Sequence, residues 1–233
     1  MRTVRSFLLF LLAIPLLLSA CAPVGAADIQ AAAERGDFLS EVCFLGDSTT
    51  AHMQQRSPLR SEQIWAAKAR YLNLDPRITY ARILAPDTGE EEEIAAVAKR
   101  LRPKYLVITL GVDYGVYYYR DQPETFRFYY EKLLCALKEA SPNTVYILQS
   151  IFPVAQSSSV ITNEMIDNAN TIIRAIAHDH GLFYLDQKSV LADENGFLRQ
   201  EFCFSEDGIH LTASAYDAIL ENLASQEKEI VKR

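Results

Sequence analysis

Residues 42–50 read Val-Cys-Phe-Leu-Gly-Asp-Ser-Thr-Thr, an apolar run that ends in a glycine and four polar residues. An unbroken apolar run of this length is typical of a strand buried on both faces of a parallel sheet. Similar runs follow along the chain, separated by longer amphipathic segments: 78–84, 105–110, 145–150 and 182–185. This alternation predicts an α/β fold, a flavodoxin-like three-layer α/β/α sandwich around a mostly parallel five-stranded sheet.

Four segments between or after these runs have the spacing of amphipathic helices: 90–101, 125–140, 163–180 and 212–230. Gly89 precedes four consecutive glutamates, Glu90 to Glu93. Carboxylates are stabilised near a helix N-terminus by the helix dipole. We therefore interpret the acidic run as the solvated first turn of a helix.

Ligands in folds of this kind bind beyond the carboxyl ends of the strands. The first predicted strand ends in Gly46-Asp47-Ser48, and Asp207-Gly208-Ile209-His210 lies just before the last predicted helix. An Asp three residues before a His can accept its Nδ1–H, which leaves Nε2 as a base. The sequence therefore predicts a catalytic triad of Ser48, His210 and Asp207, in one of the chain orders in which such triads occur.

With these motifs, residues 40–225 resemble the SGNH/GDSL hydrolase family. The resemblance implies that Ser48 is the nucleophile, His210 the base and Asp207 the acid that orients it. Residues 149–154, Gln-Ser-Ile-Phe-Pro-Val, resemble a subgroup of often exported proteins from anaerobic Gram-positive bacteria. Family members are esterases, lipases and deacetylases of carbohydrate or cell-wall polymers, so the resemblance implies ester hydrolysis without a metal or an organic cofactor.

The sequence departs from the family at the oxyanion hole. The family uses the N–H of the nucleophile, the N–H of a glycine, and an Asn side chain in a Gly-x-Asn block; here that block reads Gly111-Val112-Asp113. An ionised Asp only accepts hydrogen bonds, and losing one oxyanion donor costs about 3 kcal/mol. No glycine follows Trp65 until Gly89. We therefore expect an oxyanion hole formed by Ser48 and Gly89, with Asp113 beside it.

Three functions remain open from the sequence. The first is a serine esterase that removes short acyl or acetyl groups from acylated carbohydrate or a cell-wall polymer. The second is a degenerate surface lipoprotein that binds acylated glycan with little or no turnover, because Asp113 replaces the usual Asn. The third is an O-acyltransferase, in which a sugar hydroxyl replaces water.

The N-terminal residues have the pattern of an export signal. Arg2 and Arg5 precede an apolar run at 7–18, and Leu18-Ser19-Ala20-Cys21 resembles a bacterial lipobox. We expect a signal peptide at 1–20, a lipidated Cys21 with a tether at 21–38, and a hydrolase domain at 39–233. The protein would then be anchored to the outer face of the bacterial cytoplasmic membrane. The alternative is an ordinary cleaved signal with an incidental cysteine.

The net charge and the cysteine content limit the binding partners and metal sites that we expect. The net charge is −7 without a basic cluster, so we expect no nucleic-acid partner. Neutral acylated glycans are favoured over polyanions as substrates. We expect a monomer. Cys43 and Cys135 read as small buried hydrophobic residues, the state of Cys203 stays open, and no cysteine spacing predicts a metal site.

Aromatic residues follow the third predicted strand. Six of the twelve tyrosines fall between 114 and 130. Tyr114 and Tyr117 are candidates for a substrate platform, whereas those in the following helix are expected to pack on the sheet. His52 lies four residues after Ser48 and is either a pocket neighbour or a surface residue, and Trp65 is either pocket wall or core.

Overall fold

The computed structural model describes residues 38–112, 114–204 and 206–232. It contains a five-stranded sheet in the order β2-β1-β5-β6-β7, and every neighbouring pair is parallel. The strands are β1 (Val42–Gly46), β2 (Ile64–Ala66), β5 (Tyr105–Thr109), β6 (Val145–Gln149) and β7 (Phe183–Leu185). The predicted flavodoxin-like α/β architecture is confirmed.

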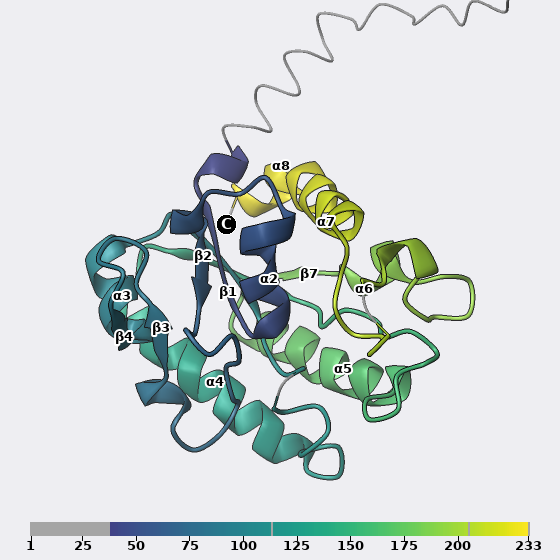
Figure 1. Ribbon diagram of the computed structural model, residues 1–233. Helices are drawn as coiled ribbons and strands as arrows, with labels where there is room; N and C mark the ends of the chain where they lie inside the picture. The colour runs from purple at the N-terminus through teal and green to yellow at the C-terminus, as the bar shows by residue number, and fades with distance from the viewer. Residues whose placement is uncertain (1–37, 113, 205, 233) are drawn as a thin grey trace, which may run out of the picture.

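Helices cover both faces of the sheet (Figure 1). One face carries α3 (Ile94–Leu101), α4 (Pro123–Ala140) and α5 (Asn163–Asp179). The other carries α2 (Ser48–Arg56) and α7 (Ala213–Ser225), followed by the short α8 (Glu227–Ile230). Further helical elements are α6 (Lys188–Leu191) and three single turns, η1 (Ser61–Gln63), η2 (Ile78–Tyr80) and η3 (Gln200–Phe202).

The strand residues pack alternately into the two layers. Val42 and Phe44 of β1 contact the core beneath α2 and α7, while Leu45 packs with the residues of α3, α4 and α5. Successive side chains of a strand point to opposite faces, so both faces of this strand are apolar. This explains why the first strand reads as one continuous apolar run.

One predicted strand is wrong. Residues 78–84 form η2 and then β3 (Arg82–Leu84), which pairs antiparallel with β4 (Glu91–Glu93) outside the main sheet. Ile78 and Ile83 are fully buried, whereas Tyr80, Arg82 and Leu84 are exposed. The strand missing from the prediction is β2, whose three residues are too few to stand out as an apolar run.

The acidic run is also misplaced in the prediction. Glu91–Glu93 is strand β4, and α3 begins only at Ile94. Arg100 of α3 donates hydrogen bonds to Glu92 at 2.6 Å and to Asp87 at 2.8 Å, and these hydrogen bonds lower the pKa of both carboxyl groups. An ion-pair network therefore holds the hairpin against α3.

The cysteines differ in exposure. Cys43 is mostly buried, and this burial raises the pKa of its thiol to about 11. Cys203 is half-buried, and Cys135 is exposed, which contradicts the expectation of a buried residue. Cys21 and the predicted signal peptide lie outside the described residues. Within the described part of the chain, no helix is both long and apolar enough to span a membrane.

Candidate active site

The turn between β1 and α2 positions Ser48 as the first residue of the helix. Asp47 caps α2, because its carboxylate accepts hydrogen bonds from the Thr49 backbone N–H and hydroxyl. The chain passes tightly here: a Cβ on Gly46 would lie 2.1 Å from Thr50 Oγ1 and 2.5 Å from the Thr109 carbonyl oxygen. Only glycine fits that position, so the Gly-Asp-Ser sequence follows from packing as well as from chemistry.

Asp47 also joins two strand ends. Its side chain is 1% exposed, and its Oδ2 accepts the backbone N–H groups of Gly111 at 3.2 Å and Val112 at 3.0 Å. A buried carboxylate requires such donors, because an uncompensated charge in the interior is costly. The loop after β5 is thereby held against the turn that carries Ser48.

His210 and Asp207 form a close pair. His210 Nδ1 lies 2.6 Å from Asp207 Oδ2, and Asp207 Oδ1 accepts the backbone N–H of Ile209 at 2.8 Å and of His210 at 3.2 Å. Gly208 has a φ of 72°, in the left-handed region that favours glycine. With Nδ1–H donated to Asp207, Nε2 is the ring nitrogen that can accept a proton.

The segment that carries His210 packs against α2. The imidazole rings of His210 and His52 have centroids 4.4 Å apart. Ser48 and His52 are four residues apart, so they share one face of α2. The structure therefore brings Ser48, His52 and His210 to the same side of this helix.

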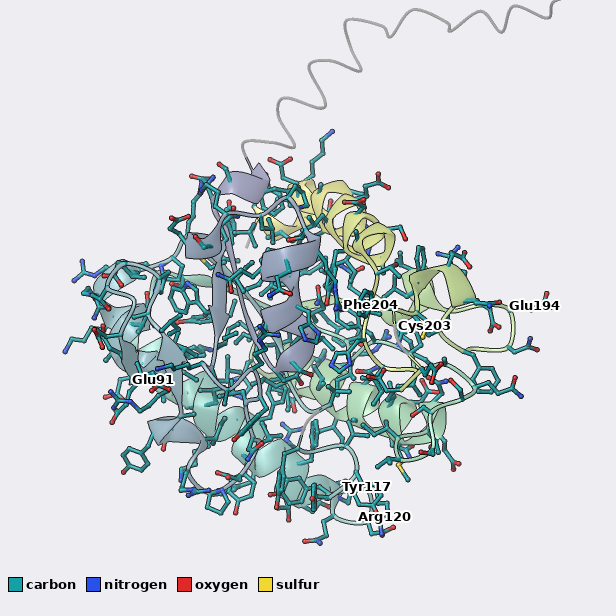
Figure 2. The ribbon with its side chains drawn as sticks, viewed as in Figure 1. Glu91, Tyr117, Arg120, Glu194, Cys203 and Phe204 are labelled. Atoms are coloured by element: carbon teal, nitrogen blue, oxygen red, sulfur yellow. The ribbon has the colours of Figure 1, made fainter. Side chains whose placement is uncertain are left out.

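Two further contacts join the same elements. Arg56 donates to the Leu211 carbonyl at 3.1 Å, and its guanidinium lies 3.4 Å from the ring centroid of Phe204. Figure 2 labels Phe204, which stands beside α2. The Tyr216 hydroxyl of α7 donates to the Thr49 carbonyl at 2.7 Å. The contacts of Arg56 with Leu211 and Phe204 hold the segment that carries His210 against α2, and the contact of Tyr216 holds α7 against the same helix.

His52 has an unusual environment. Its Nδ1 is buried without a hydrogen-bond partner among the described residues. Burial is the main cause that lowers the pKa of His52 to about 4, and the neighbouring His210, Arg56 and Arg70 lower it as well. The side chain is therefore neutral at physiological pH. Sequence reasoning left its role open, although the four-residue spacing from Ser48 was the signal that it shares the nucleophile's face.

The structure contradicts one expected oxyanion donor. The Gly89 N–H donates to the Ala85 carbonyl at 2.8 Å within the β3–β4 turn, so it is committed to the protein. The N–H groups of Gly111 and Val112 are committed to Asp47, and Asp113 lies outside the described residues.

A better candidate for an oxyanion donor is the backbone N–H of the residue directly after β2. Ala66 is the register partner of Gly46, so the next residue, Ala67, lies beside the turn that leads to Ser48. Within the described ranges, the N–H of Ala67 has no hydrogen-bond acceptor. In the sequence, no glycine follows Trp65 before Gly89, so no residue type marked Ala67 as a donor.

The tyrosines after β5 form a stacked group. Tyr114 stacks on Tyr118 with centroids 4.0 Å apart, and Tyr117 meets Tyr118 edge-on at 5.6 Å. Tyr117 and Tyr118 are 38% and 52% exposed. Figure 2 shows Tyr117 beside Arg120, whose guanidinium lies 4.7 Å from the Tyr117 ring centroid. The group presents an exposed aromatic surface after the third strand of the sheet.

Other aromatic residues belong to the core. Phe126 and Tyr130 of α4 are buried, as expected for residues that pack on the sheet, and Trp65 is fully buried. Trp65 is therefore core rather than pocket wall. Among the residues that the structure describes, no three His, Cys, Asp or Glu side chains are placed to hold a metal ion.

Comparison with known proteins identifies the family. The model of the GDSL-like lipase/acylhydrolase family matches residues 44–218, a span that includes the turn at Ser48 and the Asp207–His210 pair. The chain belongs to this family. It is an ester hydrolase of the SGNH/GDSL type. No curated protein matches the sequence.

Solved structures share the fold at low identity. A Streptococcus pneumonia protein provisionally described as a platelet activating factor is 17% identical, with a TM-score of 0.57 over 84% of this chain and 89% of its own. A GDSL-like lipase from Bacteroides thetaiotaomicron is 15% identical, with a TM-score of 0.50 over 88% and 97%. A carbohydrate esterase family 3 protein from Talaromyces cellulolyticus is 15% identical, with a TM-score of 0.51 over 82% and 97%.

Proposed function

We propose that this hydrolase is a serine esterase that removes short acyl groups, with Ser48 as nucleophile, His210 as base and Asp207 as the residue that orients the base. The observation that carries the proposal is the 2.6 Å contact between His210 Nδ1 and Asp207 Oδ2, in a segment packed against the helix that Ser48 begins. A carboxylate bound to Nδ1 fixes the tautomer in which Nε2 is free to take a proton.

The reaction proceeds by double displacement. His210 Nε2 takes the proton from Ser48 Oγ while Oγ attacks the carbonyl carbon of the ester. The tetrahedral intermediate collapses, His210 gives the proton to the leaving alkoxide, and the acyl group remains on Ser48. Water then attacks this acyl-enzyme with His210 again as base, and the acid and the free serine are released.

We propose two backbone donors for the oxyanion. The N–H of Ser48 lies at the N-terminus of α2, where the helix dipole favours negative charge. The N–H of Ala67 is available at the neighbouring strand end. The Gly111 and Val112 N–H groups compensate Asp47 instead, so a hole of two backbone donors is the arrangement this chain supports.

We further propose that the substrate is an acylated carbohydrate or cell-wall polymer and that the enzyme acts outside the cell, anchored by a lipid on Cys21. The exposed rings of Tyr117 and Tyr118 offer a surface on which a sugar can stack. One solved structure with this fold is a carbohydrate esterase, which fits the same substrate class.

Hydrolysis of p-nitrophenyl acetate tests the proposal. Ser48→Ala is expected to lower kcat by a factor on the order of 10⁴ or more. A fluorophosphonate probe is expected to label wild type and not this variant. Hydrolysis that survives Ser48→Ala would refute the proposal.

Asp113→Asn tests the alternative of a binding protein with little turnover. A carboxylate next to a developing oxyanion opposes catalysis, whereas an amide donates a hydrogen bond. If wild type shows no turnover that depends on Ser48 and Asp113→Asn restores it, the chain is a degenerate member. If Asp113→Asn lowers the activity, Asp113 is a working part of the site.

A further inference from the structure

A polar cavity of about 290 Å³ lies along α2, on the side of β2. Four segments line it: α2, η1 with β2, the loop after β2, and the β3–β4 turn. Its polar side chains are those of Gln54, Gln55, Ser61, Lys68 and Arg70, and its lining also includes Ala51, Ala66 and Ala67. The lining contains two cations and no carboxylate, in a chain with 30 acidic and 23 basic residues.

The cavity is next to the proposed nucleophile. Ala51 lies three residues after Ser48 on α2, and Ala66 is the register partner of Gly46. Ala67, whose N–H we assign to the oxyanion, is itself part of the lining. A substrate whose carbonyl oxygen meets Ala67 would extend its neighbouring groups into this cavity.

The two cations of the lining have no side-chain partners among the described residues. The side chains of Lys68 and Arg70 make no hydrogen bond, ion pair or ring contact with any described residue, and both residues are exposed. Every other arginine within the described ranges makes at least one such contact. Arg100 is an example, with both Asp87 and Glu92 as acceptors.

The backbone at Arg70 supports a role for this loop. Arg70 has a φ of 64°, a left-handed conformation that a residue with a side chain rarely adopts. Such strained positions gather at functional sites, where the rest of the structure holds them. Its charge also reaches the catalytic region, because Arg70 is one of the groups that lower the pKa of His52.

We propose that this cavity binds an anionic substituent of the substrate, a carboxylate or phosphate carried by the acylated sugar, through Lys68 and Arg70. A guanidinium binds either group through paired hydrogen bonds, and an ammonium adds a point charge. Gln54, Gln55 and Ser61 supply donors and acceptors for sugar hydroxyls. The inference rests on the proposed esterase function and changes the expected substrate from a neutral glycan to an acidic one.

Three matched substrates test this inference: methyl glucoside acetylated at its three ring hydroxyls, the corresponding glucuronide, and the corresponding glucoside phosphorylated at its exocyclic hydroxyl. Acetate release gives kcat/KM for each. We expect wild type to prefer one or both anionic esters by about 10- to 100-fold, as charged hydrogen bonds allow. The better of the two identifies the anionic group.

The double variant Lys68→Gln/Arg70→Gln is expected to remove this preference, so that its kcat/KM for the anionic esters falls to its value for the neutral ester. Lys138→Gln/Lys228→Gln is the matched control, because it removes the same total charge from two lysines of α4 and α8 whose side chains make no hydrogen bond or ion pair with any described residue. Equal kcat/KM for neutral and anionic esters in wild type, no hydrolysis of any of the three, or an equal loss in the control, overturns the inference. Failure of the esterase function itself is separate, since it shows as p-nitrophenyl acetate hydrolysis that is absent or independent of Ser48.

Discussion

Two loops flank α2 at the carboxyl edge of the sheet, and they are held in different ways. The segment with His210 is bound at many points: Asp207 accepts two backbone N–H groups, the Phe204 N–H donates to the His210 carbonyl, and Arg56 binds the Leu211 carbonyl. The segment with Arg70 has one main-chain bond within its turn, from the Arg70 N–H to the Ala67 carbonyl.

The difference in how the two segments are held corresponds to two different roles, proton transfer and ligand binding. A group that transfers a proton must be held in one orientation, since small displacements reduce the rate strongly. A group that binds a charged ligand gains most when its donors are not already used by the protein. The His210 segment fits the first task and the Arg70 segment the second, and the following changes test that assignment.

The largest effect is expected from Asp207→Asn. The amide cannot hold the His210 tautomer that leaves Nε2 as base, so kcat for p-nitrophenyl acetate is expected to fall by a factor on the order of 10⁴. Asp179→Asn is the control, because Asp179 also lies beside a histidine, with Oδ1 3.2 Å from His178 Nδ1. A similar fall in both variants would contradict a specific role for Asp207.

Asp47→Asn is expected to reduce stability. The amide would present a donor to the N–H groups of Gly111 and Val112, which would leave buried polar groups unpaired. We expect a loss of about 2–4 kcal/mol in the free energy of unfolding, measured by urea denaturation.

Asp193→Asn is the matched control for Asp47. Asp193 accepts the N–H groups of Asn195 and Phe197, each at 2.9 Å, in an exposed turn. We expect Asp193→Asn to lower the free energy of unfolding by less than about 1 kcal/mol, because water can replace the acceptor at this exposed site. Equal losses in the two variants would show that the burial of Asp47 does not matter.

Arg56→Met is expected to lower kcat about tenfold while KM changes little, because the Leu211 carbonyl and the Phe204 ring lose the cation that joins them to α2. Arg174→Met removes a comparable guanidinium, 4.4 Å from the Tyr184 ring centroid on the opposite face of the sheet. That control is expected to retain wild-type kcat. A change in KM alone for Arg56→Met would place the effect on binding instead of on the imidazole.

The last change concerns stability in acid. The pKa of His52 is lowered from 6.5 to about 4 in the folded chain. As the pH falls, the unfolded chain therefore takes up this proton at a higher pH than the folded chain does. The contribution of the neutral His52 ring to the free energy of unfolding is fully present above pH 6.5 and is lost as the pH falls from 6.5 toward 4. His52→Gln is expected to lose less unfolding free energy across this window than wild type or the exposed-site control His178→Gln. Identical pH profiles for His52→Gln and wild type would contradict the lowered pKa.

The sequence predicted what strong patterns encode. Four of the five sheet strands lie in runs whose apolar residues face both layers, and the Asp207–His210 contact follows from spacing alone. It did not predict β2, because three residues between polar turns carry no periodic signal.

The predicted helix start at Gly89 failed because a tertiary contact overrides local preference. The glutamates extend as β4, since Arg100 of α3 reaches back to Glu92, and no local pattern shows that pairing. The same turn commits the Gly89 N–H to Ala85. The oxyanion assignment therefore required the register between Ala66 and Gly46, which is a property of the sheet and not of the neighbouring residues.

Both border strands of the sheet are short. β2 and β7 close the two sides of the sheet, and each has three residues. Few main-chain groups are therefore presented at either border, and a sheet border is where copies of a protein add strand to strand. We expect the folded domain to stay dispersed at high local concentration, because its sheet offers almost no template on which another copy can extend it.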